Sequence, residues 1–175
     1  MIDKKYIVLA SVPKSGSSMV AGIFANHGVY FGKCEHRTMG GNTYYSYENA
    51  VITDYFRNKK RGDLKTLLEQ EAKITPFCFK TSPTNAKAFL NEVDALVIKI
   101  KRKPQNIIKS SAPHKAPMRK QQILELDSMP GEYIDADAIM NGDYKTVKSA
   151  LEKIGYEFSE ELAKKAIDFK KWHHS

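Results

Sequence analysis

The chain has few of the residues that mark several large classes of protein. Cys34 and Cys78 are its only cysteines among 175 residues, and they lack metal-ligand spacing. We expect two reduced, structural thiols and no metal. The apolar runs are too short to span a bilayer, and the start lacks the hydrophobic stretch and cleavage site of a signal peptide. We therefore expect a cytoplasmic protein without a membrane span.

Low-complexity segments and internal repeats are also missing. The length and ordinary hydrophobic and charged contents predict one soluble domain over residues 1–175. The net charge of +8 suggests an anionic ligand or acceptor. This positive charge is spread over separate segments, and no nucleic-acid-binding motif accompanies it, so we expect no specific nucleic-acid partner. The basic segments are residues 59–61, 99–103 and 164–171.

Apolar strand-like segments alternate with amphipathic helix-like segments along the chain. The pattern predicts an α/β fold, with a central, mainly parallel sheet flanked by helices. A loop is predicted through Gly40 and Gly41, and a mobile loop over residues 111–117, which hold two prolines. Strands are predicted at residues 6–12, 77–80, 95–101 and 132–136. Helices are predicted at residues 17–27, 45–59, 63–73, 85–91, 104–111, 143–154 and 159–171.

The segment Pro13–Ser18 links the first predicted strand to the first predicted helix. Loop N–H groups and the positive end of the helix dipole converge there, which favours a bound anion. Lys14 adds a cation, and Ser15, Ser17 and Ser18 add hydroxyl donors. The expected ligand is a phosphate or a sulfate ester. A Walker A motif is excluded, because Lys14 precedes Gly16 and no glycine lies upstream.

Two segments together resemble the donor-binding motifs of sulfotransferases. Pro-Lys-Ser-Gly-Ser-Ser at residues 13–18 is similar to the loop that binds the 5′-phosphosulfate in that family. Arg102 ends a predicted strand, Pro104 follows, and Ser110 comes eight residues after the arginine, as in the family's 3′-phosphate site. A guanidinium and a hydroxyl suit a dianionic phosphate. Weaker matches to small bacterial and viral sulfotransferase-like proteins extend over most of the chain.

The resemblance implies a P-loop-like three-layer fold and a donor, 3′-phosphoadenosine 5′-phosphosulfate (PAPS), that leaves as adenosine 3′,5′-bisphosphate (PAP). Met19 stands where the family often has a tryptophan that stacks on adenine, and a thioether is a soft apolar contact. The cofactor-binding residues implied by the resemblance are Lys14, Ser15, Gly16, Ser17, Ser18, Met19, Arg102 and Ser110.

The resemblance also implies roles at the reacting group. Lys14 would neutralise charge on the leaving phosphate, steered by Ser17 or Ser18, and Lys80 would face the sulfuryl group. A general base in this family is a His or a Glu, and our candidates are Glu48, His36 and His114. The acceptor is a small molecule or a glycan, and the positive charge favours an acidic one.

Two alternatives stay open. The first is a P-loop nucleotide or small-molecule kinase, which would leave Arg102 and Ser110 without a role. The second is a protein that binds adenosine 3′,5′-bisphosphate without turnover. It is favoured by the missing R-K-G segment near the C-terminus and by Ala136, which stands where the family commonly has a tyrosine.

Overall fold

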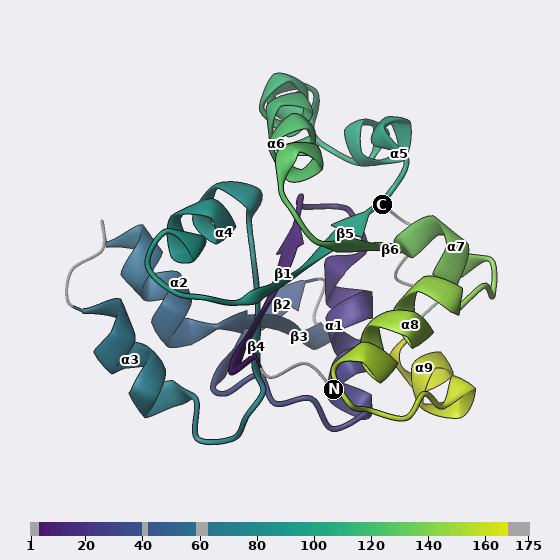
Figure 1. Cartoon of the computed structure of the whole chain (residues 1–175). Coiled ribbons are helices and arrows are strands. Elements are labelled where there is room, and N and C mark those ends of the chain that lie inside the picture. Colours follow the sequence, from purple (N-terminus) through teal and green to yellow (C-terminus); the bar gives the residue numbers. More distant parts are fainter. Residues whose placement is uncertain (1–3, 40–41, 59–62, 168–175) are drawn as a thin grey trace.

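The computed structural model describes residues 4–39, 42–58 and 63–167, with the side chains of all of these except residues 35–45. Its centre is a parallel sheet in the order β4-β1-β5-β6. Every neighbouring pair of strands is parallel, so their carboxyl ends meet at one edge (Figure 1). The predicted α/β class is confirmed. The strands are β1 (Tyr6–Ser11), β4 (Phe77–Thr81), β5 (Leu96–Lys101) and β6 (Glu132–Asp135).

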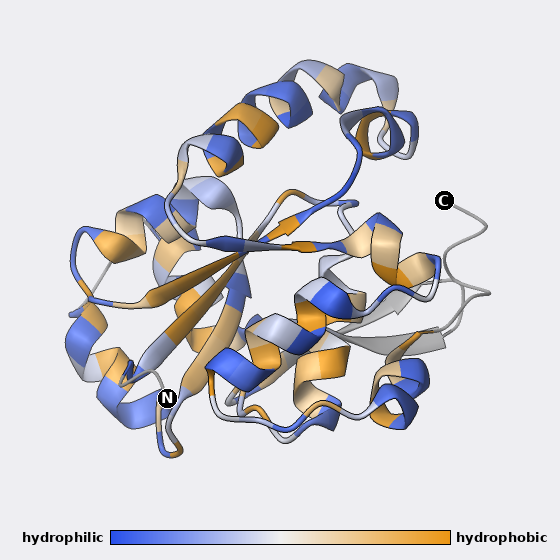
Figure 2. Cartoon of the chain, turned by 45° about the vertical axis from the view of Figure 1, so that its right-hand side comes forward, coloured by the Kyte–Doolittle hydropathy of each residue, from blue (hydrophilic) through white to orange (hydrophobic). Residues whose placement is uncertain are grey.

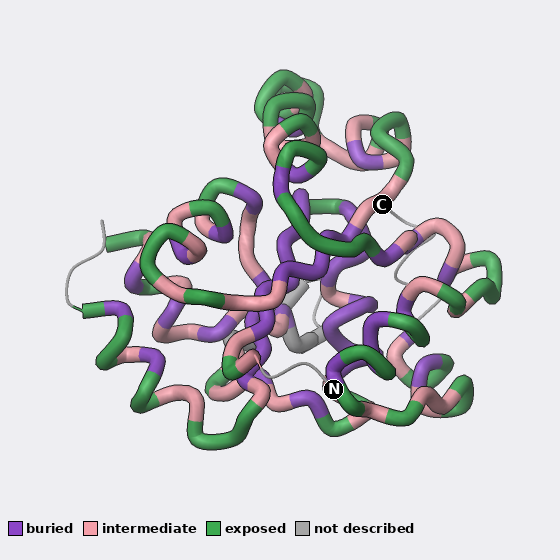
Figure 3. Tube along the Cα trace, viewed as in Figure 1, coloured by how far each residue is buried: buried purple, intermediate pink, exposed green. Residues whose placement is uncertain are grey.

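Side chains of β1 alternate between two apolar cores, because successive residues of a strand point to opposite faces. Ile7 and Leu9 join the core beneath a first layer of helices, whereas Val8 and Ala10 join the core beneath a second layer, formed by helices that lie between residues 50 and 128. Strands β1, β4 and β5 are largely buried between these helical layers, whereas β6, at the edge of the sheet, starts with two exposed residues (Figures 2 and 3). The helices of the first layer are α1 (Ser17–Asn26), α7 (Ala136–Met140), α8 (Lys145–Lys153) and α9 (Glu160–Ala166).

Between α1 and β4 the chain differs from the prediction of a loop followed by a helix from Tyr45. A hairpin of β2 (Cys34–Met39) and β3 (Asn42–Asn49) occupies this stretch. Threonine and three tyrosines favour a strand over residues 43–47. The helix starts only after Asn49, whose Oδ1 accepts a bond from the N–H of Ile52 at 3.0 Å. Helices α2 (Ala50–Arg57) and α3 (Leu64–Glu71) follow, and Asp63 caps α3 as predicted.

The segment predicted as a mobile loop at residues 111–117 instead starts a helical region that the sequence pattern missed. A 3₁₀ turn, η1 (Pro113–Lys115), leads directly into α6 (Ala116–Ser128). Both prolines lie in first turns, where a missing N–H costs nothing. Few side chains of α6 are buried, so its amphipathic signal is weak. The remaining helices are α4 (Pro83–Leu90) and α5 (Pro104–Lys109).

The final predicted helix, residues 159–171, is shorter in the structure, where α9 ends at Ala166. Residues 168–171 of that prediction lie outside the described residues. In the part of the chain that the structure describes, no helix has the length and hydrophobicity needed to cross a membrane.

Candidate functional site

The loop between β1 and α1 lies at the carboxyl edge of the sheet. Lys14 has a φ of 75° and Gly16 a φ of 83°, so two left-handed residues fold the chain tightly into the helix. Lysine rarely adopts this conformation, and such strain is typical of functional loops. Helix α1 starts at Ser17 without a side-chain cap, which leaves its first N–H groups available to a ligand.

Ser15 is fully buried in this loop. Its Oγ has no hydrogen-bond partner among the described residues. Because an unsatisfied buried hydroxyl is costly, this position fits a ligand that brings an acceptor, such as a phosphate oxygen. Ser17 is also buried, while Lys14 is exposed at the outside of the loop. The loop thus has the donors that an anion needs.

Arg102, at the end of β5, lies against this loop. Its Nη1 donates to the carbonyl oxygen of Lys14 at 3.1 Å, and its Nε donates to Asp137 Oδ1 at 3.2 Å. A guanidinium has five N–H groups, so two hydrogen bonds leave the others for a bidentate ligand. The structure therefore places the predicted cation Arg102 beside the predicted anion loop.

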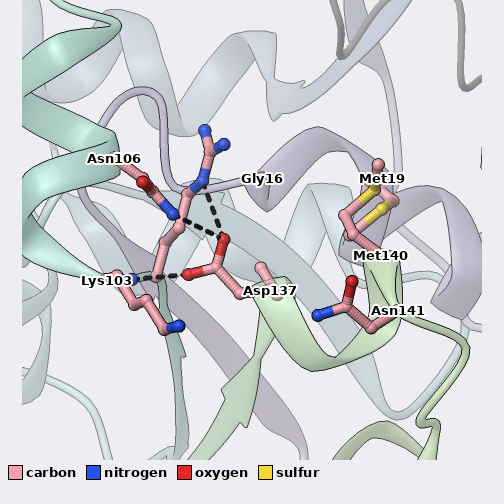
Figure 4. Close-up of a pocket in the computed structure, with 9 residues that line it drawn as sticks. Gly16, Met19, Lys103, Asn106, Asp137, Met140 and Asn141 are labelled. Carbon is pink, nitrogen blue, oxygen red and sulfur yellow. Dashed lines mark hydrogen bonds and ion pairs between the residues drawn. The ribbon is translucent and has the colours of Figure 1, made fainter.

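Asp137 holds the arginine in position, and sequence reasoning did not assign it this role. It also accepts from the backbone N–H of Lys103 at 2.7 Å and from Asn106 Nδ2 at 3.1 Å (Figure 4). One carboxylate therefore fixes the end of β5, the start of α5 and the arginine together. The parallel register of β5 and β6 pairs Lys101 with Asp135 and so brings the next residues of both segments together, but this register is known only from the structure.

Ser110 lies at the other end of α5 from Arg102. Its Oγ donates to the carbonyl oxygen of Asn106 at 2.7 Å and lies 3.2 Å from that of Ile107. The hydroxyl is therefore turned toward its own helix, and Ser110 is not among the residues that line the cavity beside Arg102. Its predicted role in binding a 3′-phosphate stays a prediction.

A cavity of about 290 Å³ opens beside Arg102 and the start of α1. The thioethers of Met19 and Met140 lie together at one end, and Asn106, Lys103 and Asp137 gather at the other (Figure 4). An apolar end beside a polar end suits a flat heterocycle that carries an anionic group. Met140, the last residue of α7, and Asn141, which follows it, are cavity residues that the sequence reasoning missed. The complete lining is Gly16, Met19, Arg102, Lys103, Asn106, Ala136, Asp137, Met140 and Asn141.

Lys80, near the end of β4, is buried with only 6% of its surface exposed. Its Nζ donates to Ser18 Oγ at 3.1 Å and lies 3.5 Å from Glu48 Oε1. A buried ammonium needs such partners to offset the loss of hydration. The structure thus brings together Ser18, Lys80 and Glu48. The hydroxyl of Ser18 bonds Lys80, whereas the resemblance suggested that Ser17 or Ser18 would steer Lys14.

Glu48 reaches Lys80 from the end of β3. The preceding residue, Tyr47, has a φ of 55°, which bends the strand, and its ring packs against Phe31 at 5.5 Å between centroids. The N–H of Glu48 donates to Ser46 Oγ at 3.3 Å. An unusual backbone conformation therefore presents this carboxylate to a buried cation, which is typical of a functional position.

The two histidine candidates for a general base lie on different elements. His36 was predicted on a loop but lies in β2, where its backbone pairs with Tyr45, and its side chain lies outside the described residues. His114 is exposed in η1. Of the two candidates with described side chains, Glu48 is the one that the structure places beside another predicted site residue.

Comparison with known proteins finds no family model, no curated protein and no solved structure that matches this chain. The function must therefore be argued from the residues and their arrangement.

Proposed function

We propose that this protein is a sulfotransferase that moves a sulfuryl group from PAPS to a hydroxyl or amine of an acceptor. The observation that carries the proposal is the 3.1 Å hydrogen bond from Arg102 Nη1 to the carbonyl oxygen of Lys14, 88 residues away. The two segments were selected from the sequence as binders of two phosphates of one nucleotide. Their contact supports a single ligand that bridges them.

On the donor side, each residue has a role that its position supports. The N–H groups at the start of α1 and the orphan hydroxyl of Ser15 would bind the 5′-phosphate in a P-loop-like cradle. The remaining N–H groups of Arg102 would bind the 3′-phosphate. Met19 and Met140 would contact the base through their thioethers. The bound donor would supply a sulfuryl group attached to a phosphate leaving group.

On the acceptor side, the buried Lys80 and the exposed Lys14 would stabilise negative charge on the oxygens of the transferring group. Glu48 would take the proton from the acceptor as its oxygen or nitrogen bonds to sulfur. The Lys80–Glu48 contact of 3.5 Å supports a catalytic role, because binding a nucleotide alone does not require a carboxylate at this edge.

A thermal-shift titration with PAP, AMP, ADP and ATP tests the donor site, because a ligand of the folded state raises the melting temperature. PAP should stabilise the protein more than AMP does. Arg102→Ala should weaken PAP by about 1.5–3 kcal/mol, the loss of a charged hydrogen bond, and should leave AMP nearly unchanged. Lys101→Ala is the matched control, because that neighbouring cation pairs with Asp127 at 2.6 Å, away from the cavity.

Equal losses of PAP and AMP in Arg102→Ala would contradict a 3′-phosphate site. Stabilisation by ATP alone would favour a kinase. Wild-type protein that binds PAP but never converts PAPS to PAP with any acceptor would be a binding protein and not an enzyme.

A further inference from the structure

Basic residues occur in several segments, but one stretch differs from the others because it has no acidic residues to balance them. Residues 95–124 contain eight lysines and arginines and no aspartate or glutamate, and the net charge of the whole chain is +8. The rest of the chain is therefore neutral overall. Basic segments elsewhere are balanced by acidic neighbours, as in the ion pairs of Lys164 with Glu160 and of Lys165 with Glu161 in α9. A field of this kind attracts anions to one part of the surface.

This stretch includes the half of α6 that extends beyond the sheet. Lys99 Nζ donates to the carbonyl oxygen of Met129 at 2.8 Å, and Lys101 pairs with Asp127 at 2.6 Å, so α6 runs antiparallel to β5. Eight residues separate Asp127 from Arg119, and at 1.5 Å per residue this is about 12 Å past the end of β5. Helix α6 consequently rises above the carboxyl edge that carries the donor site (Figure 1).

The cations of α5, η1 and the first half of α6 are exposed or lack a counter-charge. Lys109, Lys115 and Lys120, on α5, η1 and α6, are exposed, and no described carboxylate lies within ion-pair distance of them. We call these three residues, with Arg119, the α5–α6 basic surface. Isolated exposed lysines are ordinary, but three on consecutive packed elements without any acidic residue form a patch of one sign.

Arg119 is a buried member of this surface, with 9% of its area exposed. Its Nη1 donates to Gln122 Oε1 at 2.7 Å, and its Nε has no partner among the described residues. Burial lowers the pKa of its guanidinium. A buried cation without a carboxylate costs free energy unless a ligand supplies the anion. This arginine therefore points to an anionic ligand rather than to fold stability.

The chemistry of the ligand follows from three requirements. The ligand must carry several negative charges, and it must offer a hydroxyl to the Lys80–Glu48 group. It must also bind without aromatic stacking, because residues 95–124 contain no Phe, Tyr or Trp. Single-stranded nucleic acids depend on such stacking. A polysaccharide with carboxylate or sulfate groups provides the charges and a hydroxyl on nearly every sugar.

We propose that the α5–α6 basic surface binds an acidic polysaccharide and presents its hydroxyl groups to the site at the sheet edge as the acceptor. The role of the polysaccharide as acceptor rests on the proposed function. Its binding rests on the arrangement of charges alone.

Binding is tested with a fluorescent oligouronate of about eight sugars, beside a neutral dextran of the same length, in an anisotropy titration. The wild-type protein should bind the oligouronate and not the dextran, and added salt should weaken binding steeply. The triple variant Lys109→Gln, Lys115→Gln, Lys120→Gln should lose about tenfold in affinity, as expected for three exposed charge contacts. The matched control, Lys65→Gln, Lys73→Gln, Lys145→Gln, removes the same charge from exposed sites elsewhere and should change affinity less than twofold.

Arg119→Met is the second variant. It should weaken the oligouronate severalfold while the melting temperature stays the same or rises, because the side chain has no counter-charge to lose. A large fall in melting temperature with unchanged affinity would show that Arg119 serves packing and not binding.

The two proposals fail separately in these measurements. The triple lysine variant should keep its response to PAP, and Arg102→Ala should keep its affinity for the oligouronate.

Equal losses in the triple variant and its control, or equally tight binding of a dT oligonucleotide, an acidic peptide or anionic vesicles, would overturn the polysaccharide site. Vesicles are a necessary comparison because α6 also exposes Met118 and Leu124. Binding without oligouronate-stimulated release of PAP from PAPS would overturn the acceptor role.

Discussion

Cys78 is a fully buried thiol in β4, and burial raises its pKa well above the ordinary value. The unfolded chain releases this proton near pH 8.5, whereas the folded chain retains it. The unfolded state therefore binds fewer protons above that pH, and stability falls as pH rises through the unfolded value. We expect this thiol to remove about 1 kcal/mol of stability between pH 8 and pH 9.5.

Urea unfolding at both pH values measures this effect, and Cys78→Ala is the comparison. The variant should be less stable at pH 8 but should lose less stability on going to pH 9.5. The pKa of Tyr156 is also raised, first by burial and then by Cys78. The part due to burial is common to both proteins and cancels in the difference, whereas the part due to Cys78 belongs to the effect of the substitution. Identical alkaline losses in the two proteins would contradict the assignment to Cys78.

Single site residues differed in how far the sequence could predict them. Lys14, Arg102 and Lys80 were predictable, because a cation at the carboxyl end of a buried strand, or in the loop just after it, lies at the carboxyl edge of a parallel sheet. Asp137 was not, because an aspartate between a strand and a helix is usually a cap. Asp135 is such a cap, accepting from the N–H of Ala138 at 3.0 Å, and the sequence does not distinguish the two.

Asn49, the residue after Glu48, links several elements. Its Oδ1 caps α2, while its Nδ2 donates to Glu71 of α3 at 2.9 Å and to the carbonyl oxygen of Phe31 at 3.3 Å. Asn49 is 1% exposed, so truncation would leave buried groups unsatisfied. We expect Asn49→Ala to lower the free energy of unfolding by about 2–4 kcal/mol, from the lost cap and the orphaned acceptors.

Urea denaturation of Asn49→Ala checks this value. Asn58→Ala is the control, because that exposed side chain bonds only Asp54 among the described residues, at 2.8 Å, and should change stability by less than about 0.5 kcal/mol. If both variants lose the same small amount, Asn49 does not connect these elements energetically.

At the scale of elements, the sequence predicted buried strands and helices better than exposed ones. Strand β1 is a nearly continuous apolar run and β5 is mostly apolar, while α1 has an apolar stripe and α3 a cap, so the sequence predicted them within a few residues. The hairpin β2–β3 was missed because a tyrosine-rich, polar stretch near a helix start fits either structure. Helix α6 was missed because only Arg119 and Leu126 of its residues are buried. Tertiary contacts decide such weakly patterned segments.

The whole molecule depends on β1, which contributes side chains to both cores. Leu9 is fully buried in the core beneath α1 and α8, and Val8 is fully buried in the core beneath α3 and α4. Removing either side chain should therefore weaken a structure that both layers share. We expect Leu9→Ala to lower the free energy of unfolding by about 2–5 kcal/mol, the range for a buried leucine, and Val8→Ala to lower it by less.

One domain should unfold in one transition, so the two layers should respond together. Amide hydrogen exchange of Leu68 in α3 and Leu151 in α8, which belong to opposite cores and lie past the first turn of their helices, measures the layers separately in one sample. Under conditions where exchange requires global unfolding, Leu9→Ala should accelerate both amides by the same factor, although Leu9 contacts only one core. Faster exchange at Leu151 alone would show that the layer of α1, α7, α8 and α9 opens independently, and the single-domain prediction would be wrong.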